Sequence, residues 1–323
     1  MKIVHLVLSN SFAGIEQHVD ELLANNLLEN PILICNESIA DNFDKHISIY
    51  KIKNIGRRSL IGKFKLSQLL TKINPDIVHT HGSKTTTIIA SINKNKYKHV
   101  ATVHGVKKNK KVYKKADFVI GVSQNAVEGI DNNLRIITNW WYPELTKPQT
   151  RNKKYALAIG RLEKIKGFDL LISSWINIKS DLIIVGSGKE KGNLVNLINE
   201  KNLSNKITII DDVNRNELSK YYNNASVLIV SSRDEGGPRV ALEALYQEIP
   251  VISTRVGHMP EILPDELLAE PDSLESLRGL IQTHVGNNNY LQDSIFQYVK
   301  EEFSLRGQSK KILDIYKNLF VSQ

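Results

Sequence analysis

Residues 225–243 read Ala-Ser-Val-Leu-Ile-Val-Ser-Ser-Arg-Asp-Glu-Gly-Gly-Pro-Arg-Val-Ala-Leu-Glu, and they indicate the fold class more clearly than any other part of the chain. The uncharged run 225–230 is typical of a strand buried in a parallel sheet. Pro238, after a Gly-Gly turn, suits the first turn of a helix because its missing N–H would be unpaired there. The helix that follows is apolar on nearly every side, so the Glu243 carboxylate must find partners. We predict a strand–turn–helix unit with Glu235 at its mouth, where parallel α/β sheets form ligand crevices.

Short apolar runs alternate with longer segments of mixed polarity, the pattern typical of βαβ units and parallel sheets. We predict strands at 2–8, 32–35, 47–52, 76–79, 99–104, 117–122 and 135–138, and then at 155–159, 181–185, 206–210, 226–230 and 250–253.

A weak spot separates the two groups of strands. Residues 142–153 contain proline, are polar and lack periodicity, so we place a linker there. We expect an α/β protein with one doubly wound domain at 1–147, a second at 148–305 and an amphipathic C-terminal helix within 306–323. Two such domains would leave a cleft between the carboxyl ends of their sheets.

Size and composition exclude several classes of protein. At 323 residues the chain is long enough for two ordinary α/β domains. No apolar run is long enough to span a bilayer, and the apolar start of the chain is too short for a signal peptide. A single cysteine, Cys35, excludes an internal disulfide and a cysteine-based metal site. These features predict a cytoplasmic protein.

The net charge of +9 is the one unusual feature of the composition. Many of the lysines fall between Lys94 and Lys115. This region would suit nucleic acid, an anionic membrane surface or an anionic acceptor, and it is equally well explained as a solvated lysine-rich face. No nucleic-acid-binding signature accompanies the charge, so we expect no nucleic-acid partner.

Two glycine-containing turns follow predicted strands of the second half. Residues 160–169 read Gly-Arg-Leu-Glu-Lys-Ile-Lys-Gly-Phe-Asp, and 185–189 read Val-Gly-Ser-Gly-Lys. Arg161 and Lys166 place two positive charges on the first of these turns, where they would favour an anionic ligand group. The second turn, which contains Gly186, has the glycine spacing of neither a P-loop nor a dinucleotide fingerprint.

Strand ends of the first half carry histidines and a glycine loop. Residues 11–19 read Ser-Phe-Ala-Gly-Ile-Glu-Gln-His-Val, 75–82 read Pro-Asp-Ile-Val-His-Thr-His-Gly, and 102–105 read Thr-Val-His-Gly. His81 and His104 follow parallel strands on the side where ligands bind, so we predict a site role for both.

Together these stretches resemble the family 4 retaining glycosyltransferases, which have the two-domain GT-B fold. Glu235 and Glu243 match the family's Glu-x7-Glu motif, and 160–169 matches its Gly-Arg-Leu-x-x-x-Lys-Gly-Phe element. The flanking 248–253 and 256–262 match its Pro-Val-Ile strand entry and its Pro-Glu-Ile turn. Ala13 and Trp140-Trp141 depart from the pattern, and the tryptophans would either stack on a sugar or fill the interdomain segment.

The resemblance implies a role for each matching residue. Catalytic roles fall to Arg161, Lys166, Glu235 and His104. Donor-binding roles fall to Gly14, Gly186, Gly237, Pro238, Arg239, Val240 and Glu243, the last of which would accept hydrogen bonds from ribose. Acceptor-side candidates are Glu16, His18 and His81, together with Trp141, which departs from the family pattern but could stack on a sugar. The terminal helix would return to the first domain.

The function expected is transfer of a sugar, with retention, from a nucleotide-sugar such as a UDP-sugar to a hydroxyl of a saccharide or lipid-linked glycan. Surface polysaccharide synthesis, such as that of lipopolysaccharide or capsule, is the expected setting. No Asp-x-Asp pair is placed to hold a metal, so we expect no metal and no cofactor. Peripheral contact with the inner membrane would suit a lipid-linked acceptor. The alternatives are a non-hydrolysing nucleotide-sugar epimerase, or a non-enzymatic basic module that binds membranes or nucleic acid.

Overall fold

The chain divides into two compact units. In a computed structural model, unit 1 comprises Met1–Asn139 and Leu305–Gln323, and unit 2 comprises Trp140–Ser304. The structure describes residues 1–25, 27–92, 96–106, 109–131, 133–141, 154–286 and 292–321. The predicted linker at 142–153 and the predicted boundary after residue 147 lie outside the described residues.

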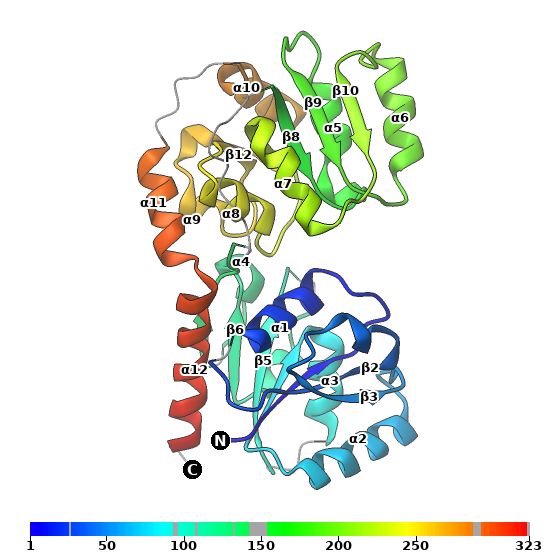
Figure 1. Ribbon diagram of the computed structural model, residues 1–323, viewed down its shortest axis with the longest axis vertical. Coiled ribbons are helices and arrows are strands. Elements are labelled where there is room, and N and C mark those ends of the chain that lie inside the picture. The colour runs from blue at the N-terminus through cyan, green and yellow to red at the C-terminus, as the bar shows by residue number, and fades with distance from the viewer. Residues whose placement is uncertain are drawn as a thin grey trace. The chain divides into compact units, whose positions relative to one another are not determined.

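Unit 1 contains a seven-stranded parallel sheet in the order β3-β2-β1-β4-β5-β6-β7 (Figure 1). Its strands are β1 (Ile3–Val7), β2 (Ile32–Asn36), β3 (Ser48–Ile52), β4 (Ile77–His81), β5 (Lys98–Val103), β6 (Phe118–Gly121) and β7 (Leu134–Ile136). Its helices are α1 (Gly14–Ala24), α2 (Leu60–Ile73), α3 (Ser83–Ile92), α4 (Gln124–Val127) and α12 (Leu305–Val321), with short 3-10 turns at Glu37–Asn42 and Tyr113–Lys115.

Alternate residues of the strands in unit 1 face two different helical layers. Val4 and Leu6 of β1 pack in one core cluster with Leu66 of α2 and Ile88 of α3. Val7 packs on the other side in a cluster with residues of α1. This period of two is the expected geometry of a strand, and it sends His5 to the face covered by α1.

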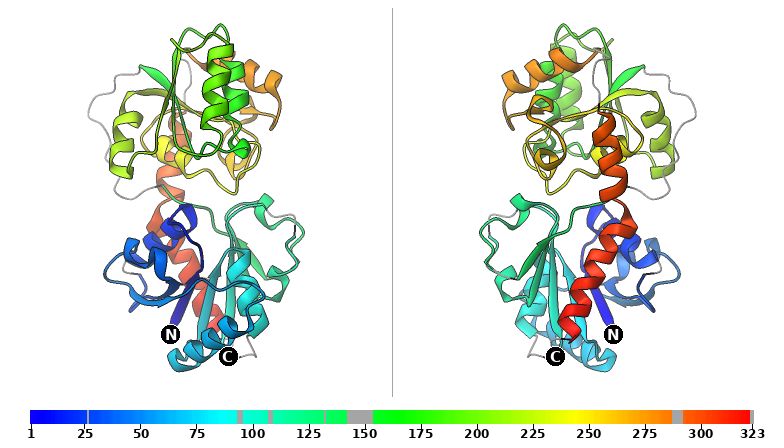
Figure 2. Two further views of the ribbon diagram at one scale, coloured as in Figure 1. Left: turned by 90° about the vertical axis from the view of Figure 1, so that its right-hand side faces the viewer. Right: turned by 90° about the vertical axis from the view of Figure 1, so that its left-hand side faces the viewer.

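The C-terminal helix α12 belongs to unit 1 although it follows all of unit 2 in the sequence. It lies along the first unit (Figure 2). It buries Ile312, Ile315 and Tyr316, and the Asn25 amide after α1 donates a hydrogen bond of 2.8 Å to the Ser309 hydroxyl. The helical spacing of these apolar residues explains which face of α12 is buried.

Unit 2 contains a six-stranded parallel sheet in the order β10-β9-β8-β11-β12-β13. Its strands are β8 (Tyr155–Ile159), β9 (Asp181–Val185), β10 (Ile207–Ile210), β11 (Ala225–Val230), β12 (Val251–Thr254) and β13 (Leu268–Ala269). Its helices are α5 (Phe168–Ser174), α6 (Lys191–Glu200), α7 (Arg215–Asn224), α8 (Arg239–Tyr246), α9 (Met259–Ile262), α10 (Leu274–His284) and α11 (Asp293–Glu302), with 3-10 turns at Lys164–Lys166 and Asp265–Leu267.

Both sheets are doubly wound, which confirms the predicted pair of Rossmann-like domains. The strand order reverses between β1 and β4 in unit 1 and between β8 and β11 in unit 2. Each predicted strand is present within a few residues of its predicted bounds, whereas β13, with only two residues, is too short to show a periodicity. In the described ranges, no helix combines the length and apolarity needed to cross a bilayer.

Candidate active site

Two loops of unit 2 meet where its strand order reverses. One loop follows β8 and carries Lys166, and the other follows β11 and carries Glu235. The Lys166 ammonium forms an ion pair with the Glu235 carboxylate, and their side chains are only 20% and 14% exposed. The Ser232 hydroxyl donates a further hydrogen bond of 2.9 Å to the same carboxylate oxygen. Ligands of doubly wound sheets bind at such reversal points, so this pair is the centre of the candidate site.

The backbone holds these two loops together. The Ser231 hydroxyl donates to the Lys166 carbonyl oxygen at 3.0 Å. Gly167 lies in the left-handed region at φ +65°, and a Cβ there would come within 2.0 Å of the Ser231 carbonyl oxygen. Only glycine fits this approach, which explains the Lys-Gly-Phe spacing of the motif.

Gly186 performs a similar task beside β8. A Cβ at this position would lie 1.9 Å from the carbonyl oxygen of Gly160, and its φ is +155°. The glycine therefore lets the end of β9 touch the start of the Arg161 loop. The structure accounts for Gly186 by packing alone, and its predicted contact with the donor stays a prediction.

Arg233 lies in the matching stretch of sequence, but its role is visible only in the structure. Its guanidinium bonds both carboxylate oxygens of Asp169 at 2.7 Å and reaches Asp272 at 2.6 Å. Its hydrogen bond to Asp169 is the main reason that its pKa lies above the ordinary arginine value. Because this fork joins the loop after β11 to the start of α5, Arg233 fixes the loop that carries Glu235. In the sequence, the position of Arg233 two residues before Glu235 is the feature that could have indicated this role.

Arg161 is more exposed than Lys166. Its guanidinium bonds the Glu163 carboxylate at 2.6 Å, with 64% of the Arg161 side chain exposed. The structure thus places both predicted diphosphate cations on the loop after β8, one in an enclosed pair and one at the surface. An exposed pair of this kind contributes little to stability, which leaves Arg161 able to change partners.

Glu243 is buried in α8 and has the polar partner that its burial requires. Only 3% of the residue is exposed, and the Tyr222 hydroxyl of α7 donates a hydrogen bond of 2.9 Å to its carboxylate. Pro238 is the N-cap of α8, so Arg239 and Val240 form the first turn and Gly237 stands just before it. The helix start predicted to face the donor is therefore one residue later than expected, because Pro238 has extended backbone angles.

The two tryptophans pack within unit 2. Trp140 is fully buried, and Arg239 donates to its carbonyl oxygen at 3.3 Å while lying 6.0 Å from its ring centroid. Trp141 stacks on Tyr246 of α8 at a centroid distance of 3.9 Å. Trp141 was predicted on the acceptor side, but the structure gives it a packing partner beside the donor motif. Arg239 is likewise held by Trp140 rather than projecting freely.

In unit 1, Glu16 caps the first turn of α1. Its carboxylate accepts hydrogen bonds from the Ser9 hydroxyl at 2.5 Å and from the Ala13 N–H at 2.9 Å. Such contacts fix the loop after β1 against the helix start. Gly14, at that start, has open space where a Cβ would be, so none of the residues that the structure describes requires glycine there.

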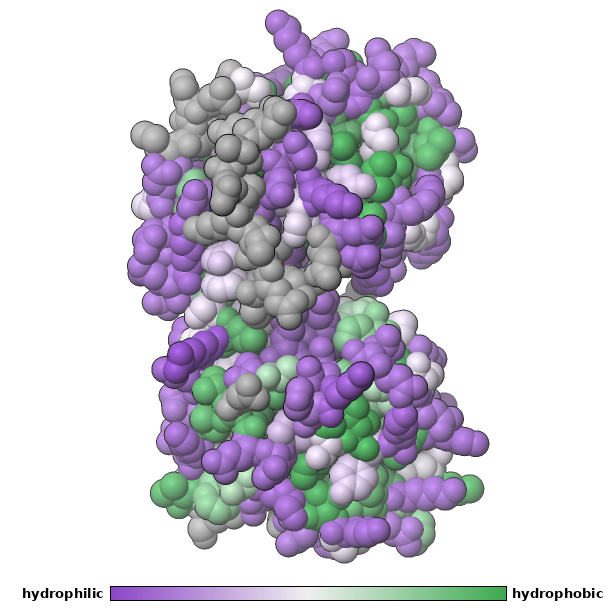
Figure 3. Space-filling view, in the orientation of Figure 1, coloured by the Kyte–Doolittle hydropathy of each residue, from purple (hydrophilic) through white to green (hydrophobic). Residues whose placement is uncertain are grey.

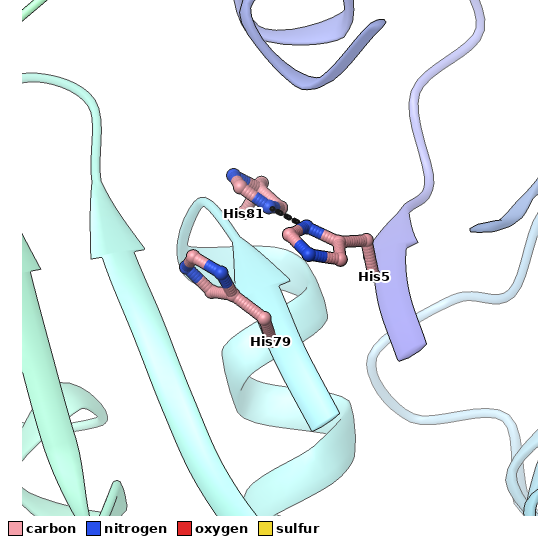
Figure 4. Close-up of side chains that lie close together, drawn as sticks. All are labelled: His5, His79 and His81. Atoms are coloured by element: carbon pink, nitrogen blue, oxygen red, sulfur yellow. Dashed lines mark hydrogen bonds between the residues drawn. The ribbon is translucent and has the colours of Figure 1, made fainter. Parts of the chain in front are cut away.

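Histidines of unit 1 form a hydrogen-bonded chain, in which His5, His79 and His81 are buried and His104 is half-buried. His81 bonds His104 at 3.1 Å through one ring nitrogen and His5 at 3.0 Å through the other. His5 and His79 both bond the Tyr316 hydroxyl of α12, at 3.3 and 2.5 Å. Figure 4 shows His5 of β1 and His79 and His81 of β4 gathered on one face of the sheet. His18 of α1 lies edge-on to His104, with ring centroids 4.7 Å apart.

Burial keeps His5, His79, His81 and His99 neutral. Loss of hydration lowers the pKa of His5 to about 3 and that of His99 to about 4. It also holds the pKa of His79 and of His81 well below the ordinary histidine value. Neutral imidazoles donate through one nitrogen and accept through the other, so the network can be satisfied without charge.

Two histidine groups have ligand atoms close enough to share a metal ion. In the described parts of the chain, these are His5, His79 and His81, and His18, His81 and His104, with atoms within 4.8 Å of one another. In the first group each ring nitrogen already has a partner, since His79 also bonds the Thr102 hydroxyl at 2.7 Å. This arrangement is suited to linking α12 with the strand ends rather than to chelating an ion.

Sequence similarity to known proteins extends over both units. The sequence matches the family described as Glycosyltransferase Family 4 over residues 13–139 and the family described as Glycosyl transferases group 1 over residues 144–296. An uncharacterised glycosyltransferase of Methanocaldococcus jannaschii is 27% identical over 313 residues, which span 89% of each chain.

Two further similarities are shorter or more distant. The amylovoran biosynthesis glycosyltransferase AmsD of Erwinia amylovora is 33% identical over 120 residues, covering 36% of this chain and 34% of that protein. The crystal structure of Anabaena HepE with UDP and glucose superposes with a TM-score of 0.84 at 17% identity, over 98% of this chain and 100% of HepE. The chain belongs to the family 4 glycosyltransferases and has their GT-B fold.

Proposed function

We propose that this glycosyltransferase moves a hexosyl or N-acetylhexosaminyl group, with retention of configuration, from a UDP-sugar to a hydroxyl of a saccharide or lipid-linked glycan. The observation that carries the proposal is the enclosed contact of Lys166 with Glu235 at the strand-order reversal of unit 2. This contact joins Lys166, which is predicted to bind the leaving diphosphate, to Glu235, which is predicted to contact the donor sugar.

The proposed reaction is a front-face displacement. The bond from the anomeric carbon to the diphosphate oxygen breaks, and the bond to the acceptor oxygen forms on the same face. The acceptor proton passes to the departing phosphate oxygen. Lys166 and Arg161 balance the charge that grows on the diphosphate, so the step does not call for a divalent metal.

UDP is proposed as the leaving group because a structural relative, HepE, was crystallised in complex with UDP and glucose. Glu243 would accept hydrogen bonds from the ribose, since a buried carboxylate already held by Tyr222 is fixed in place. His104, at the end of β5, would contact the donor sugar, and His18 and His81 would support the acceptor side.

The biological setting is proposed from the relatives. AmsD is named for amylovoran biosynthesis, and by similarity to it we place this protein in the synthesis of a surface polysaccharide such as lipopolysaccharide or capsule. A lipid-linked acceptor would place the protein in the cytoplasm, in peripheral contact with the inner face of the membrane.

A ligand screen followed by product analysis tests the proposal. Thermal shifts with UDP, GDP, ADP and their sugars should single out UDP and one UDP-sugar. With an acceptor pool, the product should carry the donor's anomeric configuration by NMR. An inverted product would refute retention, and stabilisation by GDP or ADP alone would refute the proposed donor class.

A further inference from the structure

Helix α2 has two apolar faces, and only one of them is covered. Leu66, Leu70 and Ile73 recur at helical spacing and are buried in the core of unit 1. At 100° per residue, the side chains of Leu60, Ile61 and Phe64 centre on the opposite side of the helix. They are 80%, 73% and 63% exposed, so three large apolar side chains of one helical turn face solvent.

The exposed turn is firmly held. The Ser59 hydroxyl accepts a hydrogen bond of 3.2 Å from the Gly62 N–H and caps the helix. Ile55, which is buried, packs so closely on Gly62 that a Cβ there would lie 2.7 Å from its side chain. The apolar side chains are therefore presented outward by a helix start that is anchored to the core.

The charge around this turn has a single sign. Between Asp44 and Asp76 the chain contains no carboxylate and eight lysines or arginines. Arg57 and Arg58 precede the turn, and Lys65 follows Phe64 at the exposed surface. Figure 3 is coloured by hydropathy, and it shows purple hydrophilic residues next to green apolar residues on the displayed face of the molecule.

The basic region at Lys94–Lys115 is less suited to such a contact. Lys110 bonds the carbonyl oxygens of Asn125 and Glu128 at 3.0 and 2.9 Å, and Lys114 pairs with Asp131 at 2.9 Å. Residues 93–95 and 107–108 lie outside the described residues. Lys110 and Lys114 thus already have partners within unit 1, whereas the α2 turn combines exposed apolar groups with positive charge.

We propose that the α2 face, formed by Arg57, Arg58, Leu60, Ile61, Phe64 and Lys65, docks on an anionic lipid bilayer. The apolar side chains would enter the boundary between headgroups and acyl chains, and the basic side chains would contact the headgroups. A second copy of the chain fits less well, because two copies meeting on this face would oppose positive charge to positive charge. The inference rests on the peripheral membrane contact proposed above, to which it assigns a surface, and does not depend on the identity of the donor.

Vesicle flotation of the full chain tests the proposal without any substrate. The wild type should float with vesicles of phosphatidylglycerol and phosphatidylcholine at about 0.05 M salt and much less at about 0.5 M, and should not float with pure phosphatidylcholine. Leu60→Ser/Ile61→Ser/Phe64→Ser should lower the partition coefficient by about tenfold or more. Thermal melting should show the variant folded, since the three side chains are largely exposed.

A matched pair of charge variants separates a local surface from net charge. Arg58→Glu/Lys65→Glu should reduce flotation by about tenfold or more, whereas Lys179→Glu/Lys201→Glu, with the same change of charge in unit 2, should not. Equal losses in the two variants would overturn the proposal, as would wild-type flotation of the serine variant. Concentration-dependent dimerisation that the serine substitutions abolish, without vesicle binding, would show that the face pairs two copies and would also overturn it.

Discussion

The Lys166 ammonium and the Glu235 carboxylate form an ion pair between the loops that follow β8 and β11. Neither side chain is more than one-fifth exposed, so solvent screens the pair less than it screens the pair of Arg161 with Glu163. A diphosphate that reached Lys166 would compete with Glu235 for it. In the proposed site, the charge of the leaving diphosphate would therefore affect the position of Glu235, which is predicted to contact the sugar.

Replacing Lys166 with Ala should lower turnover by about 10²–10³-fold, because the leaving diphosphate loses a fixed cation. Arg161→Ala should have a smaller effect of the same sign, since its side chain is more exposed. The matched control is Lys164→Ala, which removes an exposed lysine from the same 3-10 turn and should leave kcat unchanged. Steady-state kinetics check this, and near-normal turnover in both test variants would refute the mechanism.

Glu243→Ala should weaken UDP binding by about ten- to a hundredfold, because a hydrogen bond between a carboxylate and ribose would be lost. Tyr222→Phe should weaken it less, since the carboxylate remains but loses the donor that fixes it. Titration calorimetry measures both affinities. Tyr221→Phe, at the neighbouring position, is the control, and an unchanged affinity in Glu243→Ala would contradict the ribose role.

Unit 1 should lose stability as the pH falls below about 6.5. His5, His79, His81 and His99 have lowered pKa values in the folded state because they are buried, so they take up protons only on unfolding. The unfolded state then binds more protons, and each histidine lowers the free energy of unfolding by up to about 1.4 kcal/mol per pH unit. For His5 and His99 the loss continues down to folded pKa values of about 3 and about 4.

Thermal unfolding between pH 7.5 and pH 5 checks this expectation. His46→Ala is the control, because the His46 side chain is 90% exposed and its loss should leave the pH dependence almost unchanged. A melting temperature for unit 1 that stays constant across this range would contradict the buried neutral network.

Turnover should survive chelation of divalent metals. The proposed charge balance is provided by Lys166 and Arg161, so prolonged treatment with EDTA should leave the initial rate within about twofold of the untreated enzyme. A loss of activity that Mg²⁺ or Mn²⁺ restores would show instead that a metal shares this task.

Gly186→Ala should destabilise unit 2 by about 3 kcal/mol or more, because the new methyl group would collide with the Gly160 carbonyl oxygen. Gly192→Ala in α6 is the matched control. A Cβ there meets nothing within 4 Å, so this substitution should raise stability by about 0.5–1 kcal/mol. Chemical denaturation measures both, and similar stabilities would refute the packing role of Gly186.

Much of the fold was predictable because it depends on local patterns. Buried strands such as 155–159 and 181–185 are uniformly apolar or nearly so, and their bounds were predicted to the residue. The short β13 was missed because two residues carry no pattern. The site motifs were recognised for a similar reason, since glycines at fixed spacing reflect close backbone approaches such as that of Gly167 to Ser231.

Local patterns in the chain were thus enough to predict two doubly wound domains and the residues at their strand ends, because period and turn chemistry act over a few residues. The partners of these residues became known from the folded structure: Glu235 for Lys166, Tyr222 for Glu243, Tyr246 for Trp141, and Tyr316 of the last helix for His79 of the first unit. These contacts join residues from 21 to 237 positions apart. They arise from the packing of separate elements, and no local pattern of residues specifies which side chains will meet.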